Sequence, residues 1–176
     1  MDGPEQVGEL VVSAEQIAAR VEELAAQLSA DYAGAVPVLV GALTGGFVFL
    51  ADLVRRLTVA AEVDFVIARS YGRGVQSVGN VRIVWGPERD LSGRDVILVE
   101  DIVDTGLTAQ RLVAHLRAGG ARTVRVCALL DKPSGRRVEF AADYVGFEVP
   151  PAFVIGYGLD HAERHRGLPY VATLKR

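Results

Sequence analysis

The sequence is poor in the residues that build disulfides and membrane spans. Cys127 is the only cysteine among 176 residues, which excludes an internal disulfide and a cysteine-ligated metal cluster. Cys127 stands in the apolar run 124–130, so we expect a buried, unreactive thiol. No run of about 18 apolar residues is present, so no transmembrane helix is predicted. The acidic start, MDGPEQ, does not resemble a signal peptide, and we expect a cytoplasmic protein.

An excess of basic charge is also missing. The formal net charge is −3, which gives no bulk attraction to nucleic acid or to an anionic membrane. The sequence shows no internal repeat and no low-complexity tract. Half of the residues are hydrophobic, which argues against disorder and for a full core. The length fits a single domain over residues 1–176.

Residues 94–109, RDVILVEDIVDTGLTA, contain the clearest candidate site. The apolar run 96–99 predicts a buried strand. Three acids and a helix-opening turn follow it: Glu100, Asp101, Asp104, Thr105, Gly106 and Thr108. A helix N-terminus offers free N–H groups to a phosphate, and glycine lets the backbone approach closely. Carboxylates suit sugar hydroxyls, Mg²⁺ or a transferred proton. The pattern is typical of a phosphate-ester site.

A second strand–glycine–helix pattern lies earlier in the chain. The run 38–43 predicts a buried strand, which leads through Thr44, Gly45 and Gly46 into a helix over 47–57. In a parallel α/β sheet both turns would lie at the carboxyl ends of strands, where ligands bind. A plain loop between a strand and a helix would carry the same glycines, so the pattern alone leaves both interpretations open.

The remaining segments extend the α/β pattern. Ser13 and Gln16 form a capping box that opens a helix over 13–28. Further strands are predicted at 62–70, 81–84 and 123–130, and a helix at 107–116. The glycine-rich segment 71–80 is either a mobile lid or a hairpin tip.

After residue 133 the pattern changes. The short runs 138–140, 143–147 and 153–157 are parted by glycine and proline, which indicates a small irregular subdomain. We therefore predict a core over about 10–133 and a smaller part over about 134–176, with a possible N-terminal contribution. Lys132 follows a strand and either faces the acids or is a solvated loop charge. His161 and His165 have a metal-like spacing, but no third zinc-type ligand stands near.

Several of these segments resemble one enzyme family. VILVEDIVDTGLT at 96–108 resembles the phosphoribosyl-pyrophosphate (PRPP) signature of type I phosphoribosyltransferases. Other segments resemble hypoxanthine–guanine phosphoribosyltransferases in order and spacing: GALTGGFVFLADLVRRL at 41–57, SYG at 70–72, LLDKP at 129–133, ADYVGFEVP at 142–150 and FVIGYGLDHAERHRGLPY at 153–170. The resemblance covers about residue 38 to the C-terminus. It implies the type I fold, a central mostly parallel sheet flanked by helices with a small C-terminal hood.

The resemblance implies roles at the sugar and the phosphates. Glu100 and Asp101 would hold the ribose hydroxyls, directly or through Mg²⁺. The 5′-phosphate would bind Thr105, Gly106, Leu107 and Thr108. Arg166 would contact the pyrophosphate together with Thr44 and Gly45, and Asp160 would lie near a second Mg²⁺.

It also implies roles at the purine. Asp104 would act as general acid/base at N7, and Lys132 would donate to O6. Phe153 would stack on the base, and the backbone of Val154 would read its edge, with a carbonyl near Val154 or Asp160 accepting from a 2-amino group. Ser70 and Tyr71 would belong to a lid.

The implied activity is Mg²⁺-dependent purine salvage. The substrates would be PRPP and hypoxanthine or guanine, the products IMP or GMP and pyrophosphate, and the enzyme a homodimer or homotetramer. One alternative is an enzyme that prefers xanthine. Another is a PRPP-sensing regulator that binds nucleic acid, although the scattered arginines and negative charge disfavour it. The family usually has lysine where this chain has Thr44. The threonine can keep the backbone role of the lysine but lacks its charge. The replacement therefore bears on the affinity for PRPP or on communication between subunits.

Overall fold

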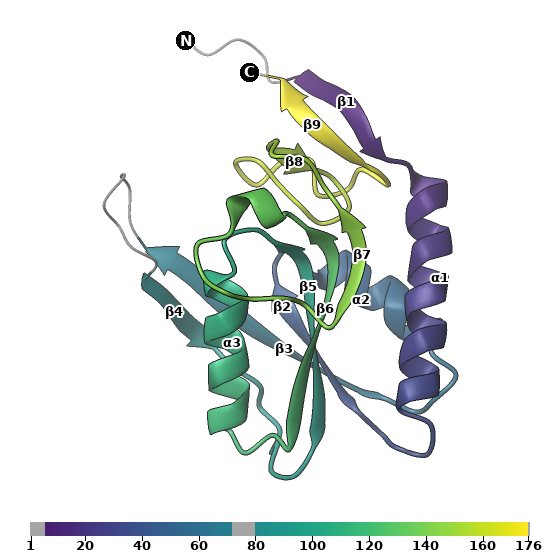
Figure 1. Ribbon diagram of the computed structural model, residues 1–176, viewed down its shortest axis with the longest axis vertical. Helices are drawn as coiled ribbons and strands as arrows, with labels where there is room; N and C mark the ends of the chain where they lie inside the picture. The colour runs from purple at the N-terminus through teal and green to yellow at the C-terminus, as the bar shows by residue number, and fades with distance from the viewer. Residues whose placement is uncertain (1–5, 72–79, 176) are drawn as a thin grey trace.

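The computed structural model describes residues 6–71 and 80–175, which form a large and a small β-sheet with helices (Figure 1). The strands of the large sheet are β2 (Val38–Leu43), β3 (Glu62–Tyr71), β4 (Asn80–Trp85), β5 (Asp95–Val103), β6 (Thr123–Asp131) and β7 (Tyr144–Glu148). Their order is β4-β3-β2-β5-β6-β7, and only β3 and β4 pair antiparallel. The predicted α/β fold with a mostly parallel sheet is confirmed.

The helices are α1 (Ala14–Asp31), α2 (Phe47–Val54) and α3 (Leu107–Ala118), with a short 3-10 helix, η1 (Pro133–Gly135). The small sheet contains β1 (Gln6–Val12), β9 (Val171–Lys175) and β8 (Val154–Ile155), in that order. Among the helices of the described ranges, none combines the length and the apolar character needed to cross a membrane.

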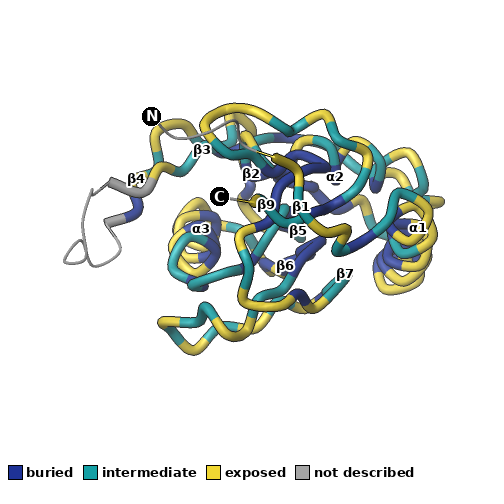
Figure 2. The backbone as a smooth tube through the Cα atoms, turned by 90° about the horizontal axis from the view of Figure 1, so that it is seen from above, coloured by how far each residue is buried: buried dark blue, intermediate teal, exposed yellow. Residues whose placement is uncertain are grey.

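Helices cover both faces of the large sheet because alternate residues of its central strands face opposite sides. Leu39 and Ile97 belong to the buried cluster that α1 and α2 complete, whereas Val38 and Leu98 belong to the cluster that α3 completes. Figure 2 shows α3 and the α1–α2 pair on opposite sides of the strands. β2 and β5 are therefore buried on both faces, as expected of central parallel strands.

The local predictions for the helices are largely confirmed. The Ser13 Oγ accepts from the Gln16 N–H, and the Gln16 Oε1 accepts from the Ser13 N–H at 2.8 Å. α1 continues beyond the predicted end at 28, whereas α2 ends before the predicted 57. Cys127 is fully buried, as predicted, and burial raises the pKa of its thiol to about 12.

Two predictions about the strands need correction, and a further strand was not predicted. The strand predicted at 96–99 continues to Val103, so Glu100 and Asp101 lie within β5. The run 143–147, expected in the smaller part, instead pairs as β7 with β6 in the large sheet. β1 was not predicted as a strand, and it pairs with β9 at the other end of the chain. In each case pairing with a distant strand decided the structure rather than the local pattern.

Candidate active site

Three loops meet at the carboxyl edge of the large sheet. They follow the neighbouring strands β2, β5 and β6 and comprise residues 44–46, 104–106 and 132–135. The small sheet lies over this edge (Figure 1). The parallel order of the three strands thus brings together segments that are far apart in the sequence.

The loop after β5 forms an open cradle at the start of α3. Gly106 has a φ of +81°, in the left-handed region that favours glycine, and α3 begins at Leu107. Residues 100–106, 108 and 109 line a cavity of about 240 Å³. The first N–H groups of a helix have no partner within the helix and point towards its N-terminal end. The geometry therefore agrees with the predicted phosphate site.

One buried acid, Glu100, and one partly buried acid, Asp101, lie beside this cradle. Glu100 is 5% exposed, and its Oε1 has no hydrogen-bond partner within the described part of the chain. Burial, and then the charge of Asp101, raise the pKa of Glu100 well above its usual range. Burial also raises the pKa of Asp101 to about 6, although the Ile102 N–H and the Arg166 charge oppose the rise. Hydroxyl donors or a cation would satisfy these carboxylates.

The turn at 44–46 packs directly on one of these acids. A β-carbon on Gly45 would overlap the Asp101 carboxylate, so glycine is required for this close approach. The Gly46 N–H donates to the Ala42 carbonyl at 2.9 Å, and α2 begins at the next residue. The peptide bond between Leu43 and Thr44 is cis.

Asp104 and Lys132 form an ion pair between two of the loops. The Lys132 Nζ lies 3.1 Å from the Asp104 Oδ2, and the lysine side chain is 17% exposed. The Lys132 N–H also donates to the Val103 carbonyl at 3.0 Å. On the other side, a β-carbon on Gly135 would overlap the Asp104 Oδ1. The loop after β6 thus fixes the position of Asp104 as well as that of Lys132.

Arg136 supports the same two loops and was not predicted. Its guanidinium donates to the Val103 carbonyl at 2.7 Å and to the Asp104 carbonyl at 2.6 Å. It also forms an ion pair with Asp131 at the end of β6. In the sequence this arginine stands in a polar run, SGRR, where it has the appearance of an ordinary surface charge. Only the meeting of two distant loops reveals its role.

Arg166 is held in place by the loop that carries it. Its Nη1 donates to the Gly158 carbonyl at 2.9 Å, and its Nη2 lies 2.9 Å from both the Asp160 Oδ1 and the Glu163 Oε2. Both Asp160 and Arg166 influence the pKa of Asp101, so they belong to the same neighbourhood. The described residues contain no group of three His, Cys, Asp or Glu side chains that could hold a metal ion. Glu100, Asp101 and Asp160 therefore do not form a ready-made cage.

Two of the predicted purine contacts, Phe153 and Val154, lie at the start of β8 in the small sheet. Phe153 is 45% exposed, and its ring meets His161 edge-on with centroids 5.4 Å apart. Val154 is buried in β8 and is the register partner of Thr173 in β9. Ser70 and Tyr71 are the last two residues of β3, and their backbones pair with β4. The rest of the predicted lid, residues 72–79, lies outside the described residues.

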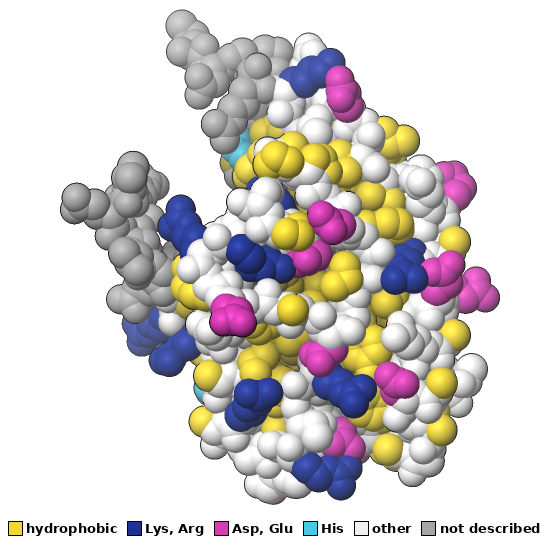
Figure 3. Space-filling model, in the orientation of Figure 1, with side chains coloured by type: hydrophobic (Ala, Val, Ile, Leu, Met, Phe, Trp, Pro, Cys, Tyr) yellow, Lys and Arg dark blue, Asp and Glu magenta, His cyan; other side chains and the backbone are white. Residues whose placement is uncertain are grey.

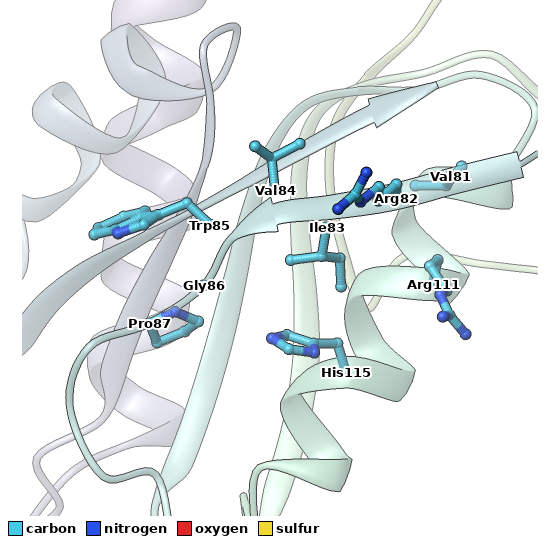
Figure 4. Close-up of a pocket in the computed structure, with 9 residues that line it drawn as sticks. All are labelled: Val81, Arg82, Ile83, Val84, Trp85, Gly86, Pro87, Arg111 and His115. Atoms are coloured by element: carbon cyan, nitrogen blue, oxygen red, sulfur yellow. The ribbon is translucent and has the colours of Figure 1, made fainter. Parts of the chain in front are cut away.

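Another cavity, larger than the one at the cradle, does not contain these residues. A groove of about 780 Å³ runs between β4 and α3 and is lined by residues 81–87 together with Arg111 and His115. Figure 4 shows Ile83 of β4 and His115 of α3 on facing walls of the groove. None of the described residues that line it carries a carboxylate. The chemistry of the smaller cavity, rather than size, identifies the candidate site.

The chain matches known proteins over nearly its full length. The model of the family "Phosphoribosyl transferase domain" matches residues 10–162. A hypoxanthine-guanine phosphoribosyltransferase of Bacillus subtilis is 44% identical over 169 residues, covering 96% of this chain and 94% of that protein. One of Streptococcus mutans is 43% identical over 171 residues, covering 97% and 95%.

Solved structures agree with this match. A crystal structure of a hypoxanthine-guanine phosphoribosyltransferase from Bacillus anthracis superposes with a TM-score of 0.90 at 37% identity, covering 97% of this chain and 99% of that one. A hypoxanthine phosphoribosyltransferase from Staphylococcus aureus gives a TM-score of 0.91 at 38% identity, covering 96% and 92%.

Proposed function

Because the chain belongs to the phosphoribosyl transferase domain family, we propose that it transfers the 5-phosphoribosyl group of PRPP to N9 of a 6-oxopurine. The products are a nucleoside 5′-monophosphate and pyrophosphate, which makes the reaction one of purine salvage. The observation that carries the proposal is the Asp104–Lys132 pair at 3.1 Å beside the phosphate cradle. In the proposed reaction this pair supplies an acid/base group and a hydrogen-bond donor to the base where it joins the sugar.

The phosphoribosyl half of the substrate fits the loop after β5. The 5′-phosphate binds the N-terminal end of α3, where N–H groups and the helix dipole favour an anion. Glu100 and Asp101 accept hydrogen bonds from the two ribose hydroxyls, which gives the buried Oε1 of Glu100 the donor it lacks. As positive charge develops on the sugar in the transition state, these acids also stabilise it electrostatically.

The base half fits the loop after β6. Lys132 donates to O6 of the purine and so disfavours adenine, whose 6-amino group is itself a donor. As N9 bonds to C1′ of the ribose, the bond from C1′ to pyrophosphate breaks, and the proton on N7 passes to Asp104. The exposed ring of Phe153 supplies a face for stacking on the base. Arg166 and the 44–46 turn hold the departing pyrophosphate.

The donor set also fits Mg²⁺. Magnesium is usually held by one or two carboxylates together with substrate oxygens rather than by an all-protein cage. The unpartnered Oε1 of Glu100 and the neighbouring Asp101 offer such oxygens. When bound, the ion neutralises the polyphosphate and lowers its repulsion from the acids.

We further propose that the enzyme is cytoplasmic and that it works as a homodimer or homotetramer. Analytical ultracentrifugation tests the oligomeric state.

A competition assay tests the proposed function. The protein, MgCl₂ and PRPP are incubated with equal amounts of hypoxanthine, guanine and xanthine, and the nucleotides formed are separated by chromatography. We expect IMP and GMP. Formation of XMP alone would favour the xanthine-preferring alternative, and no nucleotide from any base would contradict the proposed function.

A further inference from the structure

Tyr157 has an unusual backbone conformation for a large side chain. Its φ is +49°, and its neighbours Gly156 and Gly158 both have a φ of +100°. Glycine adopts such angles without cost, whereas a residue with a β-carbon is strained in the left-handed region. Tyrosine at this position therefore needs compensating contacts from its side chain, which is 6% exposed.

The compensating contact is a hydrogen bond to another element. The Tyr157 hydroxyl donates to the Asp52 Oδ2 on α2 at 2.6 Å. Asp52 also pairs with Arg55 and Arg56, which directly follow α2. Burial acts to raise the pKa of Asp52, but the Tyr157 hydroxyl and the arginines outweigh it and lower the pKa. The carboxylate is therefore charged at neutral pH, and a hydrogen bond to it is of the strong, charge-assisted kind.

The hydrogen bond lies next to the contact between two predicted pyrophosphate segments. Gly158 approaches the Gly45 carbonyl so closely that a β-carbon would overlap it. The Gly158 N–H donates to the Arg166 carbonyl, and the Gly158 carbonyl accepts from the Arg166 guanidinium, both at 2.9 Å. Asp52 stands on the helix that begins directly after the 44–46 turn. Tyr157 thus joins α2 to the loop that positions Arg166.

We propose that the Tyr157–Asp52 hydrogen bond is a positioning device for the pyrophosphate half of PRPP. It fixes the distance between the 44–46 turn and Arg166, so both segments are ready to receive the same anion without rearranging. Neither Tyr157 nor Asp52 needs to touch the substrate. The inference rests on the proposed function, since it assigns pyrophosphate to these two segments.

Tyr157→Phe tests the inference because it removes only the hydroxyl. We expect the KM for PRPP to rise about tenfold, the size expected for one hydrogen bond to a charged group. The KM for hypoxanthine should stay within about twofold, because the Asp104–Lys132 pair, which is proposed to bind the base, lies on the loops after β5 and β6. Calorimetry with inorganic pyrophosphate and MgCl₂ should show a matching loss of affinity, and this readout needs no turnover.

Tyr144→Phe is a matched control. The Tyr144 hydroxyl also donates to a carboxylate, the Asp31 Oδ2, at 2.6 Å, and Tyr144 is 4% exposed. It joins β7 to the end of α1 instead of joining α2 to the Arg166 loop. We expect this variant to lower the melting temperature while leaving the KM for PRPP unchanged.

A double-mutant cycle completes the test. Once Asp52→Ala has removed the acceptor, adding Tyr157→Phe should cause no further rise in the KM for PRPP. Additive effects would overturn the inference, as would equal rises in the KM values for PRPP and hypoxanthine, or a rise in the Tyr144→Phe control. Failure of the wild-type protein to form IMP or GMP would instead contradict the proposed function, and pyrophosphate calorimetry keeps the two outcomes apart.

Discussion

The two strand–glycine–helix turns of this protein have the same sequence pattern and different structures. After β5, the turn at Gly106 opens into a cavity of about 240 Å³ at the start of α3. After β2, the turn at 44–46 is packed between the Asp101 carboxylate and Gly158. Glycine frees the backbone for a ligand in the first turn, and it allows two protein segments to touch in the second. One local pattern therefore serves an open anion site in one place and a close-packed joint in the other.

The largest effect is expected in the open turn, at Asp104. Asp104→Asn keeps the size of the side chain and removes the carboxylate that receives the N7 proton. We expect kcat for IMP formation to fall by roughly 10²–10⁴, the range usual for general acid/base catalysis. Stopped assays with hypoxanthine and PRPP measure it, with Asp90→Asn as the control on an exposed turn. An unchanged kcat in Asp104→Asn would remove Asp104 from the mechanism.

The packed turn is broken most directly by Gly45→Ala. The added methyl group must displace the Asp101 carboxylate, so we expect the free energy of unfolding to fall by about 1–3 kcal/mol, as is usual for overpacking. The KM for PRPP should rise with it. Urea unfolding and steady-state kinetics measure the two effects. Gly119→Ala is a suitable control, because Gly119 has a φ of −75° and its nearest neighbour is 3.3 Å from the added carbon. Equal effects in both variants would contradict the packed character of the turn.

The acid between the two turns should affect stability in a pH-dependent way. The pKa of Asp101 is raised from 3.8 to about 6 in the folded protein, so the folded state binds its proton more tightly than the unfolded state. The carboxyl therefore lowers stability progressively as the pH rises from about 4 to about 6, and the full cost remains above that range.

Asp101→Asn removes this titration. We expect a gain in the free energy of unfolding at pH 7.5 of at most about 3 kcal/mol, since each pH unit of pKa displacement is worth about 1.4 kcal/mol. The side chain is partly exposed, which reduces the gain. At pH 4 the variant and the wild type should unfold alike, and denaturation at both pH values measures the difference. A gain that is the same at the two pH values would disprove the assignment.

The smallest effect is expected from Thr44→Lys, which makes the packed turn more like an anion site. The added ammonium group should attract pyrophosphate and lower the KM for PRPP by a few-fold at low salt, an effect that salt should reduce. Thr44→Gln controls for side-chain length without charge. A lower KM in both variants would show that charge is not the reason.

Local patterns predicted much of this site because its central residues are contiguous. The buried strand, the three acids and the left-handed glycine stand within residues 96–108, so neighbouring residues determine the cradle. The close approach of Gly45 to Asp101 was not predictable, because it depends on two strands meeting in register. The same holds for the contact between Arg136 and the Asp104 carbonyl.

The small sheet shows the same limit more strongly. β1 pairs with β9, and the partners Gln6 and Lys175 are near opposite ends of the sequence. The alternation of β1 is weak, since most of its residues are exposed. Nothing local identifies such a strand, because its partner rather than its own pattern supplies the burial and the hydrogen bonds.

The pairing of β1 with β9 also makes the two parts of the site depend on different segments of the chain. Every strand of the large sheet lies within residues 38–148, so the proposed phosphate cradle belongs to a sheet that includes neither end of the described chain. The small sheet instead requires residues 171–175 to pair with residues 6–12. The Leu174 N–H donates to the Phe153 carbonyl at 3.2 Å, so the stacking face proposed for the purine depends on the last strand, whereas the phosphate cradle does not.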